Sequence, residues 1–142
     1  MNKFRYFIIF IFCILLTGCG KQTLKCTKSE KNDVGKSTSK IVIVFNDNNM
    51  TNAEIETTIV LDDDYSSYSN VMVNSISNSL KSYTNKKGIK TDIVTSNNEI
   101  KTSIKFDLSK MSKNDKDIIG FDTSSSRKSI KTYYEKNKYT CK

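Results

Sequence analysis

The sequence predicts an α+β domain: an antiparallel sheet of about five strands (βββαββ) packed on one long helix, with small C-terminal helices. Two observations predict this fold class. Several segments rich in β-branched and apolar residues are separated by short turns containing Asn, Asp and Gly, as in consecutive strands. Between the third and fourth of these segments, apolar residues recur at every third or fourth position, as in a one-sided helix. A chain of 142 residues allows one modest domain, so these elements are expected to share one core.

The first three strands are predicted at residues 24–29, 41–45 and 52–61. Turns at residues 31–35 and 46–49 separate them, because Asn, Asp and Gly accept left-handed backbone geometry. Residues 41–45 are apolar on both faces, which is typical of a central strand. The third strand alternates, with Ile55, Thr57, Ile59 and Leu61 on one face and Glu54, Glu56 and Thr58 on the other. Short turns between consecutive strands favour an antiparallel meander.

The long helix is predicted between residues 65 and 83. Its apolar stripe advances in steps of three and four residues through Tyr65, Tyr68, Met72, Ile76, Leu80 and Tyr83. The three aspartates at 62–64 stand at its start, where carboxylates cap free N–H groups and complement the positive helix end. Residues 86–88, Lys-Lys-Gly, are the expected end, with cations near the last carbonyls and Gly to reverse the chain.

A hairpin is predicted next, from strands at residues 89–95 and 99–108 around a turn at 96–98. The second strand alternates throughout, with Ile100, Thr102, Ile104, Phe106 and Leu108 inward and Lys101, Ser103, Lys105 and Asp107 outward. One polar face per strand predicts a sheet that is covered on one side and solvated on the other.

The C-terminal tail contains two weaker helical segments, residues 112–119 and 125–137. The candidates for burial in the second segment are Ile130, Tyr133 and Tyr134. Residues 138–142 are expected to return Cys141 toward the first strand.

The amino terminus has the organisation of a secretory signal peptide. Lys3 and Arg5 form a short cationic start, and an unbroken apolar run follows from Tyr6 to Leu16. This run is shorter than the roughly 20 apolar residues that span a bilayer, so it favours an export signal over a transmembrane helix. An uncleaved signal anchor and a signal peptide without lipid are the alternatives.

The end of the apolar run resembles the lipobox of bacterial lipoproteins. It reads Leu16-Thr17-Gly18-Cys19. The resemblance implies cleavage by signal peptidase between Gly18 and Cys19 and a diacylglyceryl anchor on Cys19, and two acyl chains suffice for stable membrane attachment. The expected division is a lipoprotein signal peptide at 1–18, the lipidated cysteine and a short tether at 19–23, and one small extracytoplasmic domain at 24–142.

Of the four cysteines in the chain, the predicted cleavage and lipidation account for two. Cys13 leaves with the signal peptide and Cys19 carries the lipid, so Cys26 and Cys141 remain. Outside the cytoplasm thiols are not kept reduced, and an even remainder predicts a disulfide between these two. A redox or nucleophilic pair is the alternative, but the chain has neither a CxxC motif nor a His to activate a thiolate.

Catalysis is not predicted. The chain has no His, which removes the usual general base and the commonest metal ligand. Glu54 and Glu56 are interpreted as carboxylates on the solvated sheet face rather than as an acid and a base of glycoside chemistry. The sequence contains no serine-nucleophile motif and no phosphate-binding glycine-rich loop.

Two acidic segments share features with calcium sites. The aspartates at 62–64 offer the oxygen ligands that Ca²⁺ prefers, but a helix start explains them better. Residues 115–122 share features with a calcium loop, but Ile118 and Ile119 occupy positions that need oxygen ligands. No catalytic, cofactor-binding or metal-binding residue is therefore predicted, and no cofactor.

The mature chain is similar to the YehR-like family of small lipoproteins from low-GC Gram-positive bacteria. The resemblance rests on the lipobox, the short tether, the order strand–strand–helix–strand–strand, and Lys110-Met111-Ser112 before a lysine-rich terminal helix. It implies a fold and brings no catalytic residues. The Cys26/Cys141 pair is not expected in every member of that family.

The net positive charge of the chain favours anionic partners. The chain has 23 Lys and Arg against 15 Asp and Glu, a formal net charge of +8 that falls to +6 once Lys3 and Arg5 are removed. Contacts with anionic lipid headgroups or wall polymers would use this charge, and ordinary solubilising lysines are the alternative. Nucleic acid is not an expected partner of an exported, anchored domain, although Lys and Tyr alternate near the C-terminus.

These observations favour a membrane-anchored extracytoplasmic lipoprotein. It is expected to be a non-enzymatic binding or structural module of the cell envelope, held by membrane lipid through Cys19. The alternative is an accessory subunit or small enzyme that acts on envelope components. A transporter's ligand-binding subunit is a third reading, but the mature chain is too short for the usual two-lobed form.

Overall fold

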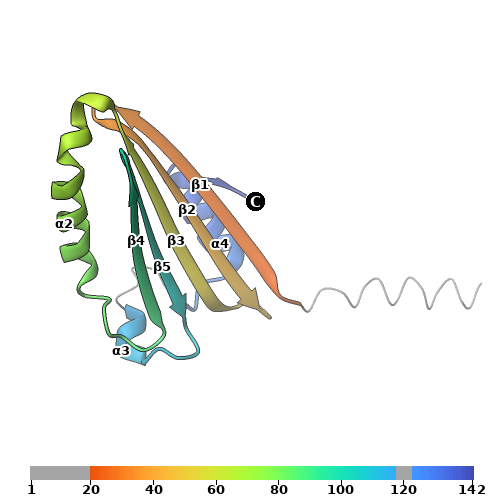
Figure 1. Cartoon of the computed structure of the whole chain (residues 1–142). Coiled ribbons are helices and arrows are strands. Elements are labelled where there is room, and N and C mark those ends of the chain that lie inside the picture. The colour runs from red at the N-terminus through yellow and green to blue at the C-terminus, as the bar shows by residue number, and fades with distance from the viewer. Residues whose placement is uncertain (1–19, 118–122) are drawn as a thin grey trace, which may run out of the picture.

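The computed structural model describes residues 20–117 and 123–142. Its strands form one antiparallel sheet in the order β4-β5-β3-β2-β1-β6 (Figure 1). The strands are β1 (Gln22–Asn32), β2 (Gly35–Asn46), β3 (Asn49–Leu61), β4 (Ile89–Ser96), β5 (Glu99–Asp107) and β6 (Thr140–Cys141). The helical elements are the 3-10 helix η1 (Asp63–Tyr68), α2 (Ser69–Leu80), α3 (Lys113–Lys116) and α4 (Arg127–Lys136).

The fold is thus a mixed α/β arrangement on an antiparallel sheet, as predicted. The five predicted strands are present and mostly longer than predicted, and the described part of the chain adds a sixth, β6, from the returning C-terminus. This two-residue strand pairs with β1 at Cys26 and Thr27. It is too short for a periodic pattern, so the sequence could indicate only that the tail returns.

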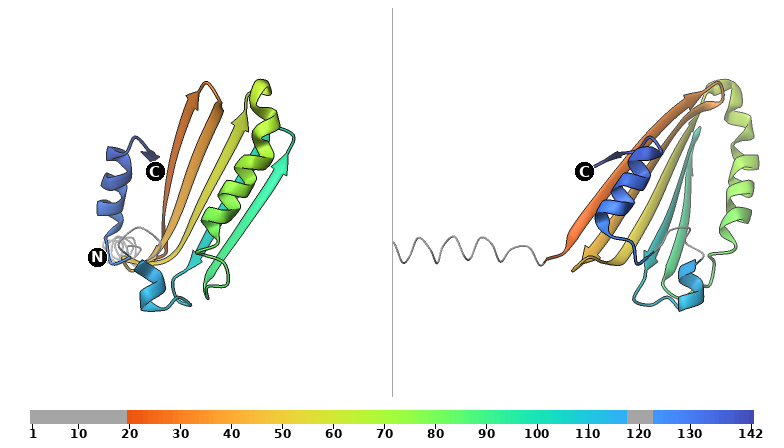
Figure 2. Two further views of the ribbon diagram at one scale, coloured as in Figure 1. Left: turned by 90° about the vertical axis from the view of Figure 1, so that its left-hand side faces the viewer. Right: turned by 180° about the vertical axis from the view of Figure 1, so that it is seen from behind.

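The helices lie on the same face of the sheet, and the opposite face carries no helix of the described chain (Figure 2). This one-sided cover follows from the alternation of the strands. Directly opposed residues share a face, so the register joins Cys26 to Ile41, Ile41 to Ile55 and Ile55 to Ile104 in one inward row. The outward rows consist mainly of Lys, Glu, Thr and Ser, which water solvates.

The core lies mainly between α4 and the half of the sheet where β1 begins. Leu24, Ile43 and Phe45 are almost fully buried there, and Ile130 and Tyr134 of α4 cover them. Leu108 and Met111, just after β5, belong to the same core. Burial of apolar area in this half is therefore the main source of stability of the domain.

The predicted single long helix is the main departure from the sequence interpretation. Its first turns form η1, a tighter 3-10 helix, and α2 ends at Leu80 rather than near residue 83. No residue of either helix is buried, and Tyr68 of the predicted stripe is 57% exposed. The apolar stripe of α2 is therefore only partly buried. Helix α4, which buries Ile130 and Tyr134, covers the part of the sheet that one long helix was expected to cover.

The expected caps of that helix also differ. Asp62 precedes η1, but its side chain accepts no capping hydrogen bond from the helix. At the other end, the last turn of α2 carries no basic residue, and the chain continues through turns to Asn85 and Gly88, both with positive φ. The reversal at Gly88 was predicted correctly, whereas the lysines beside it lie beyond the helix end.

The terminal helices begin at serine caps. Ser112 accepts a hydrogen bond from the Asp115 N–H and Ser126 accepts one from the Ser129 N–H, which fixes the starts of α3 and α4. Ile130 and Tyr134 are buried as predicted, but Tyr133 is 58% exposed because it points away from the face that those two share. The remainder of the first predicted tail helix, from residue 118, lies outside the described residues.

Candidate functional site

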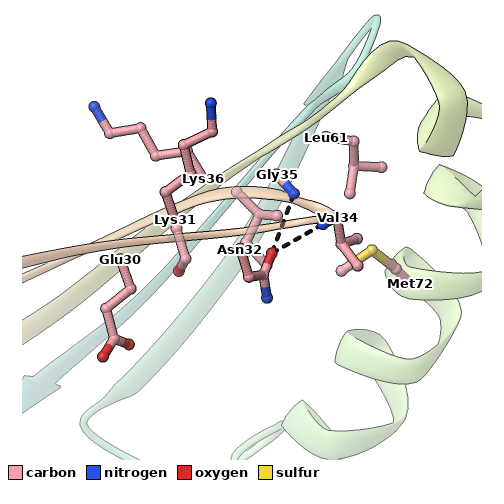
Figure 3. A pocket seen from close by; sticks show the side chains of 10 residues that line it. Glu30, Lys31, Asn32, Val34, Gly35, Lys36, Leu61 and Met72 are labelled. Carbon is pink, nitrogen blue, oxygen red and sulfur yellow. Dashed lines mark hydrogen bonds between the residues drawn. The ribbon is translucent and has the colours of Figure 1, made fainter.

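A pocket opens at the end of the sheet where β1 turns into β2 (Figure 3). Its volume is about 420 Å³. Lining residues come from the β1–β2 hairpin, from the end of β3 and from α2: Glu30, Lys31, Asn32, Val34, Gly35, Lys36, Ser37, Ile59, Leu61 and Met72. Met72 is the residue of α2 that lines this space.

The turn that frames the pocket is held rigidly. Asn32 Oδ1 accepts hydrogen bonds from the backbone N–H of Val34 at 3.1 Å and of Gly35 at 3.2 Å. The Val34 carbonyl in turn accepts from the Asp62 N–H at 3.0 Å, which fastens the hairpin to the end of β3. Gly35 is required here, since its φ is +153° and a Cβ would collide with the Val60 carbonyl oxygen.

The wall of the pocket is apolar and its rim is charged. Val34, Leu61 and Met72 lie together on one side in Figure 3, while Lys31 and Lys36 point the other way from Glu30. Glu30 forms an ion pair with Lys28 at 2.9 Å. The ionisable side chains therefore do not converge on one point, and the site offers contact surface rather than an acid–base pair.

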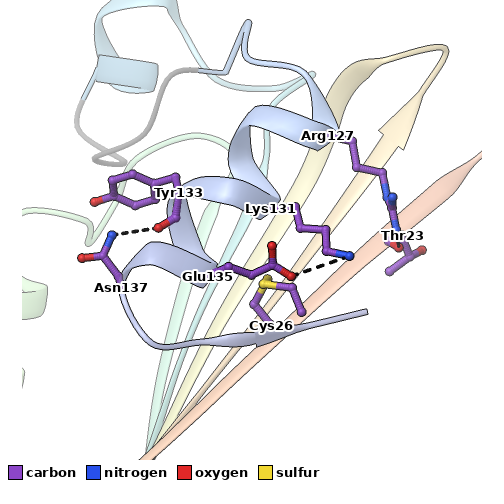
Figure 4. The surroundings of a disulfide bond; sticks show 8 residues. Thr23, Cys26, Arg127, Lys131, Tyr133, Glu135 and Asn137 are labelled. Atoms are coloured by element: carbon purple, nitrogen blue, oxygen red, sulfur yellow. Dashed lines mark hydrogen bonds and ion pairs between the residues drawn. A yellow bond between two sulfur atoms is a disulfide. The ribbon is translucent and has the colours of Figure 1, made fainter.

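The second site is the disulfide, which the structure places between Cys26 and Cys141 (Figure 4). The two residues are directly opposite in the β1–β6 ladder. Two backbone hydrogen bonds between Lys25 and Lys142, of 3.0 and 2.8 Å, continue the same ladder. Both cysteines belong to the core beneath α4, so the bridge is structural in position and no thiolate is offered to a substrate.

Helix α4 and the chain around it shield this bridge. Tyr134 packs edge-on against the ring of Tyr139, and burial, followed by the neighbouring Tyr139 and Tyr133, raises the pKa of Tyr134 to about 12. The Tyr139 hydroxyl and Ser39 Oγ form a hydrogen bond of 3.3 Å. Lys131 and Glu135 form an ion pair of 3.6 Å on the outer side of α4.

The carboxylates weighed as active groups have other partners. On the uncovered sheet face, Glu54 pairs with Lys105 at 3.2 Å and Glu56 with Lys101 at 3.5 Å. Asp115 accepts a hydrogen bond from Lys86 at 2.8 Å and another from Ser112; these bonds, Lys86 first, lower its pKa. Within residues 20–117 and 123–142, no group of three or more Cys, Asp or Glu side chains is arranged to hold a metal ion.

Gly18 and Cys19 of the predicted lipobox lie outside the described residues, as does the predicted signal peptide before them. The structure begins at Gly20, and β1 starts at Gln22. None of the helices in the described part is long and apolar enough to cross a membrane.

The fold and these sites define a small α/β domain with a one-sided antiparallel sheet, a terminal disulfide and a pocket at the far hairpin. No protein-family model matches the sequence, and no curated protein matches it either. Among solved structures, the chain resembles an NMR structure of a protein from Streptococcus pneumoniae TIGR4, with a TM-score of 0.59 and 15% sequence identity. The match covers 86% of this chain and 85% of that one, and at this identity it shows the fold alone.

The pocket was not predicted, since it depends on where α2 sits relative to the hairpin. One local signal pointed to this end of the molecule. Lys31 and Lys36 flank a turn of the kind that joins adjacent strands, so pairing across it sets two like charges against each other.

Proposed function

We propose that this chain is a lipid-anchored lipoprotein on the extracytoplasmic face of the cell membrane, and that its domain is a non-enzymatic binding module. One observation carries the proposal. Strand β1 begins at Gln22, so only Gly20 and Lys21 separate it from Cys19, and its other end forms one wall of the pocket. With an acyl anchor on Cys19, the sheet would stand on the bilayer with its strands directed outward.

The geometry supports presentation of the pocket away from the membrane. Strand β1 has 11 residues, and at about 3.3 Å per residue it spans roughly 35 Å. Gln22 is paired with Phe45, so the β2–β3 turn at Asp47 belongs to the anchored end. The β1–β2 turn at Asp33 belongs to the opposite end, beside the pocket.

Binding is favoured over catalysis by the side chains of the pocket. Val34, Leu61 and Met72 provide an apolar wall, which suits an apolar group of a ligand or of a partner protein. Lys31 and Lys36 diverge from Glu30, so no acid and base face one another across the space (Figure 3).

We also infer a relationship to the YehR-like lipoproteins. The support is the order of strands around α2 and the segment Lys110-Met111-Ser112, which precedes α3 and the lysine-rich helix α4. The relationship implies a common architecture and does not identify a ligand.

Lipidation is tested by mass spectrometry of the full-length protein expressed in a Gram-positive host. The expected mature N-terminus is a diacylglyceryl-modified Cys19, and the C19A variant is expected to remain unlipidated and to keep residues 1–18, because the predicted cut requires that cysteine. The C13A variant is the matched control, because Cys13 lies in the apolar core of the signal and should not affect lipidation. An unmodified N-terminus at any other residue would contradict the anchor.

Orientation is tested with one fluorescent amino acid placed at Asp33 or at Asp47, two exposed turn residues at opposite ends of the sheet. In vesicles that carry a quencher in the headgroup layer, the probe at Asp47 should be quenched strongly. The probe at Asp33, roughly 35 Å farther out, should be affected little. Equal quenching at both positions would show that the sheet lies flat on the membrane.

A further inference from the structure

A row of lysines occupies the uncovered face of β1 and β2. Lys25 and Lys31 on β1 and Lys36 and Lys40 on β2 are all exposed, and the alternation of the strands directs them to this face. We call these four residues the lysine strip. The other residues on this face of the two strands carry no charge: Thr23, Thr27, Ser29, Thr38, Val42 and Val44.

No acidic side chain of the described residues neutralises the charges of the lysine strip. Lys31 and Lys36 are directly opposite in the β1–β2 ladder, a placement in which like charges destabilise a sheet, and Figure 3 shows both side chains on the same side of the hairpin. None of the four lysines forms an ion pair with any of the described residues. Lys40 is opposite Glu56, but Glu56 pairs instead with Lys101 on β5.

The spacing of the strip selects the shape of its ligand. Lys25 and Lys31 are six residues apart on one strand, which places them roughly 20 Å apart along it. Between the charged positions, Ser29 Oγ and Thr38 Oγ1 form a hydrogen bond of 3.0 Å and leave further hydroxyl capacity on the surface. The register therefore sets two pairs of charges along the strands, Lys31 with Lys36 and Lys25 near Lys40, and this spacing fits an extended polyanion better than a single small anion.

We propose that the lysine strip binds a linear, phosphodiester-linked polymer of the cell wall that runs along β1. Ammonium groups act as point charges toward phosphate, and a chain of phosphodiesters presents one charge per repeat. The inference rests on the anchored orientation proposed above, in which the strip rises from the bilayer. A planar membrane at the anchored end would reach Lys25 but not Lys31 or Lys36, so the polymer is favoured over lipid headgroups.

The test uses full-length protein in uncharged phosphatidylcholine nanodiscs and poly(glycerol phosphate) as the probe. If four phosphates are neutralised, the affinity should fall roughly 50-fold between about 50 and about 200 mM salt. The K25Q/K31Q/K36Q/K40Q variant should bind at least about tenfold more weakly at the lower salt concentration and show a flatter salt dependence.

A matched control removes four exposed lysines elsewhere. The K81Q/K87Q/K128Q/K136Q variant has the same net charge as the strip variant and should keep its affinity within about twofold. If the two variants lose affinity equally, or if the wild-type protein does not bind the polymer, the proposal is wrong. Weaker binding of the strip variant to anionic vesicles, with unchanged polymer binding, would likewise overturn it in favour of lipid.

A smaller variant guards against misfolding. K31Q/K36Q removes the opposed like charges, so it should melt no lower than the wild-type protein while binding the polymer several-fold more weakly. Unchanged affinity of this variant for the polymer would contradict the proposal that the lysine strip binds it. Because the probe and the nanodisc replace the cell envelope, a negative result here leaves the outcome of the lipidation experiment unaffected, and the two proposals can fail separately.

Discussion

Cys26 and Cys141 are directly opposite one another in the β1–β6 ladder although 115 residues separate them along the chain. The disulfide between them joins the first strand of the sheet to the last. It lies in the core beneath α4, together with Ile130 and Tyr134. One covalent bond therefore closes nearly the whole domain into a loop.

Removal of this bond should lower stability substantially. On the chain-entropy model, closing a loop of this length stabilises the folded state by about 4–5 kcal/mol. For a domain of this size the C26S/C141S variant should melt roughly 10–20 °C lower than the oxidised protein. Calorimetry of the oxidised, reduced and double-serine forms checks this; equal melting temperatures would mean that the bridge contributes nothing.

The two helices should differ in their share of the core. Ile130 on α4 is 5% exposed and Val71 on α2 is 65% exposed. I130A should therefore cost about 2–5 kcal/mol of unfolding free energy, because it leaves a cavity. V71A should change it by less than about 0.5 kcal/mol. Urea unfolding of both variants measures the difference, and similar losses would show that Val71 packs more closely than its exposure indicates.

Acid should weaken the contact between α3 and the loop before β4. The hydrogen bond from Lys86 lowers the pKa of Asp115, so the ionised form stabilises the folded state above the unfolded pKa of about 3.9. That stability is lost as the pH falls through the lower pKa of the folded state. Urea unfolding between pH 7 and about 2 should give a shallower acid decline for D115N than for the wild-type protein.

K86Q provides the control for this prediction. It removes the first partner but keeps the carboxylate and its hydrogen bond from Ser112, so its acid decline should lie between those of the wild-type protein and D115N. Asp107, whose pKa is lowered first by the hydrogen bond from Lys110, stays intact in both variants and supplies a remaining decline. An unchanged pH profile in both variants would show that the ion pair does not contribute to folding.

The hairpin beside the pocket should not tolerate a side chain at Gly35. A Cβ there would collide with the Val60 carbonyl, and the positive φ adds backbone strain. G35A should therefore lower the unfolding free energy by roughly 2–4 kcal/mol. G20A is the matched control, because no atom lies within 4 Å of its Cβ, and it should leave stability unchanged. Equal stability of the two variants would mean that the hairpin can relax.

Much of the sheet could be predicted because strand periodicity and turn chemistry are local. The turn at 31–35 and the inward row through Ile55, Ile59 and Leu61 follow directly from neighbouring residues. The stripe on α2 was also read correctly as one side of a helix. Periodicity states which residues share a side, but not whether another surface lies close enough to bury them, so the exposure of α2 was missed.

The pocket and the lysine strip illustrate the same limit. Met72 and Val34 line the same pocket only because of where α2 lies relative to the hairpin, a tertiary placement that neither segment encodes alone. The strip needs the register of β1 against β2, which sets Lys31 opposite Lys36. The cysteine pairing could be predicted from the sequence, because the predicted signal peptide and lipobox account for Cys13 and Cys19 and leave only two cysteines.

The direct continuation from Gly20 into β1 has a mechanical consequence. A membrane anchor at one end of β1 and a polymer along its length would load the strand parallel to its own axis. The hydrogen bonds to β2 run perpendicular to that axis and extend over all 11 residues of β1, so a pull along the strand shears them together rather than opening them one by one. In the anchored, polymer-bound arrangement proposed above, the β1–β2 ladder would therefore resist tension between the membrane and the wall polymer.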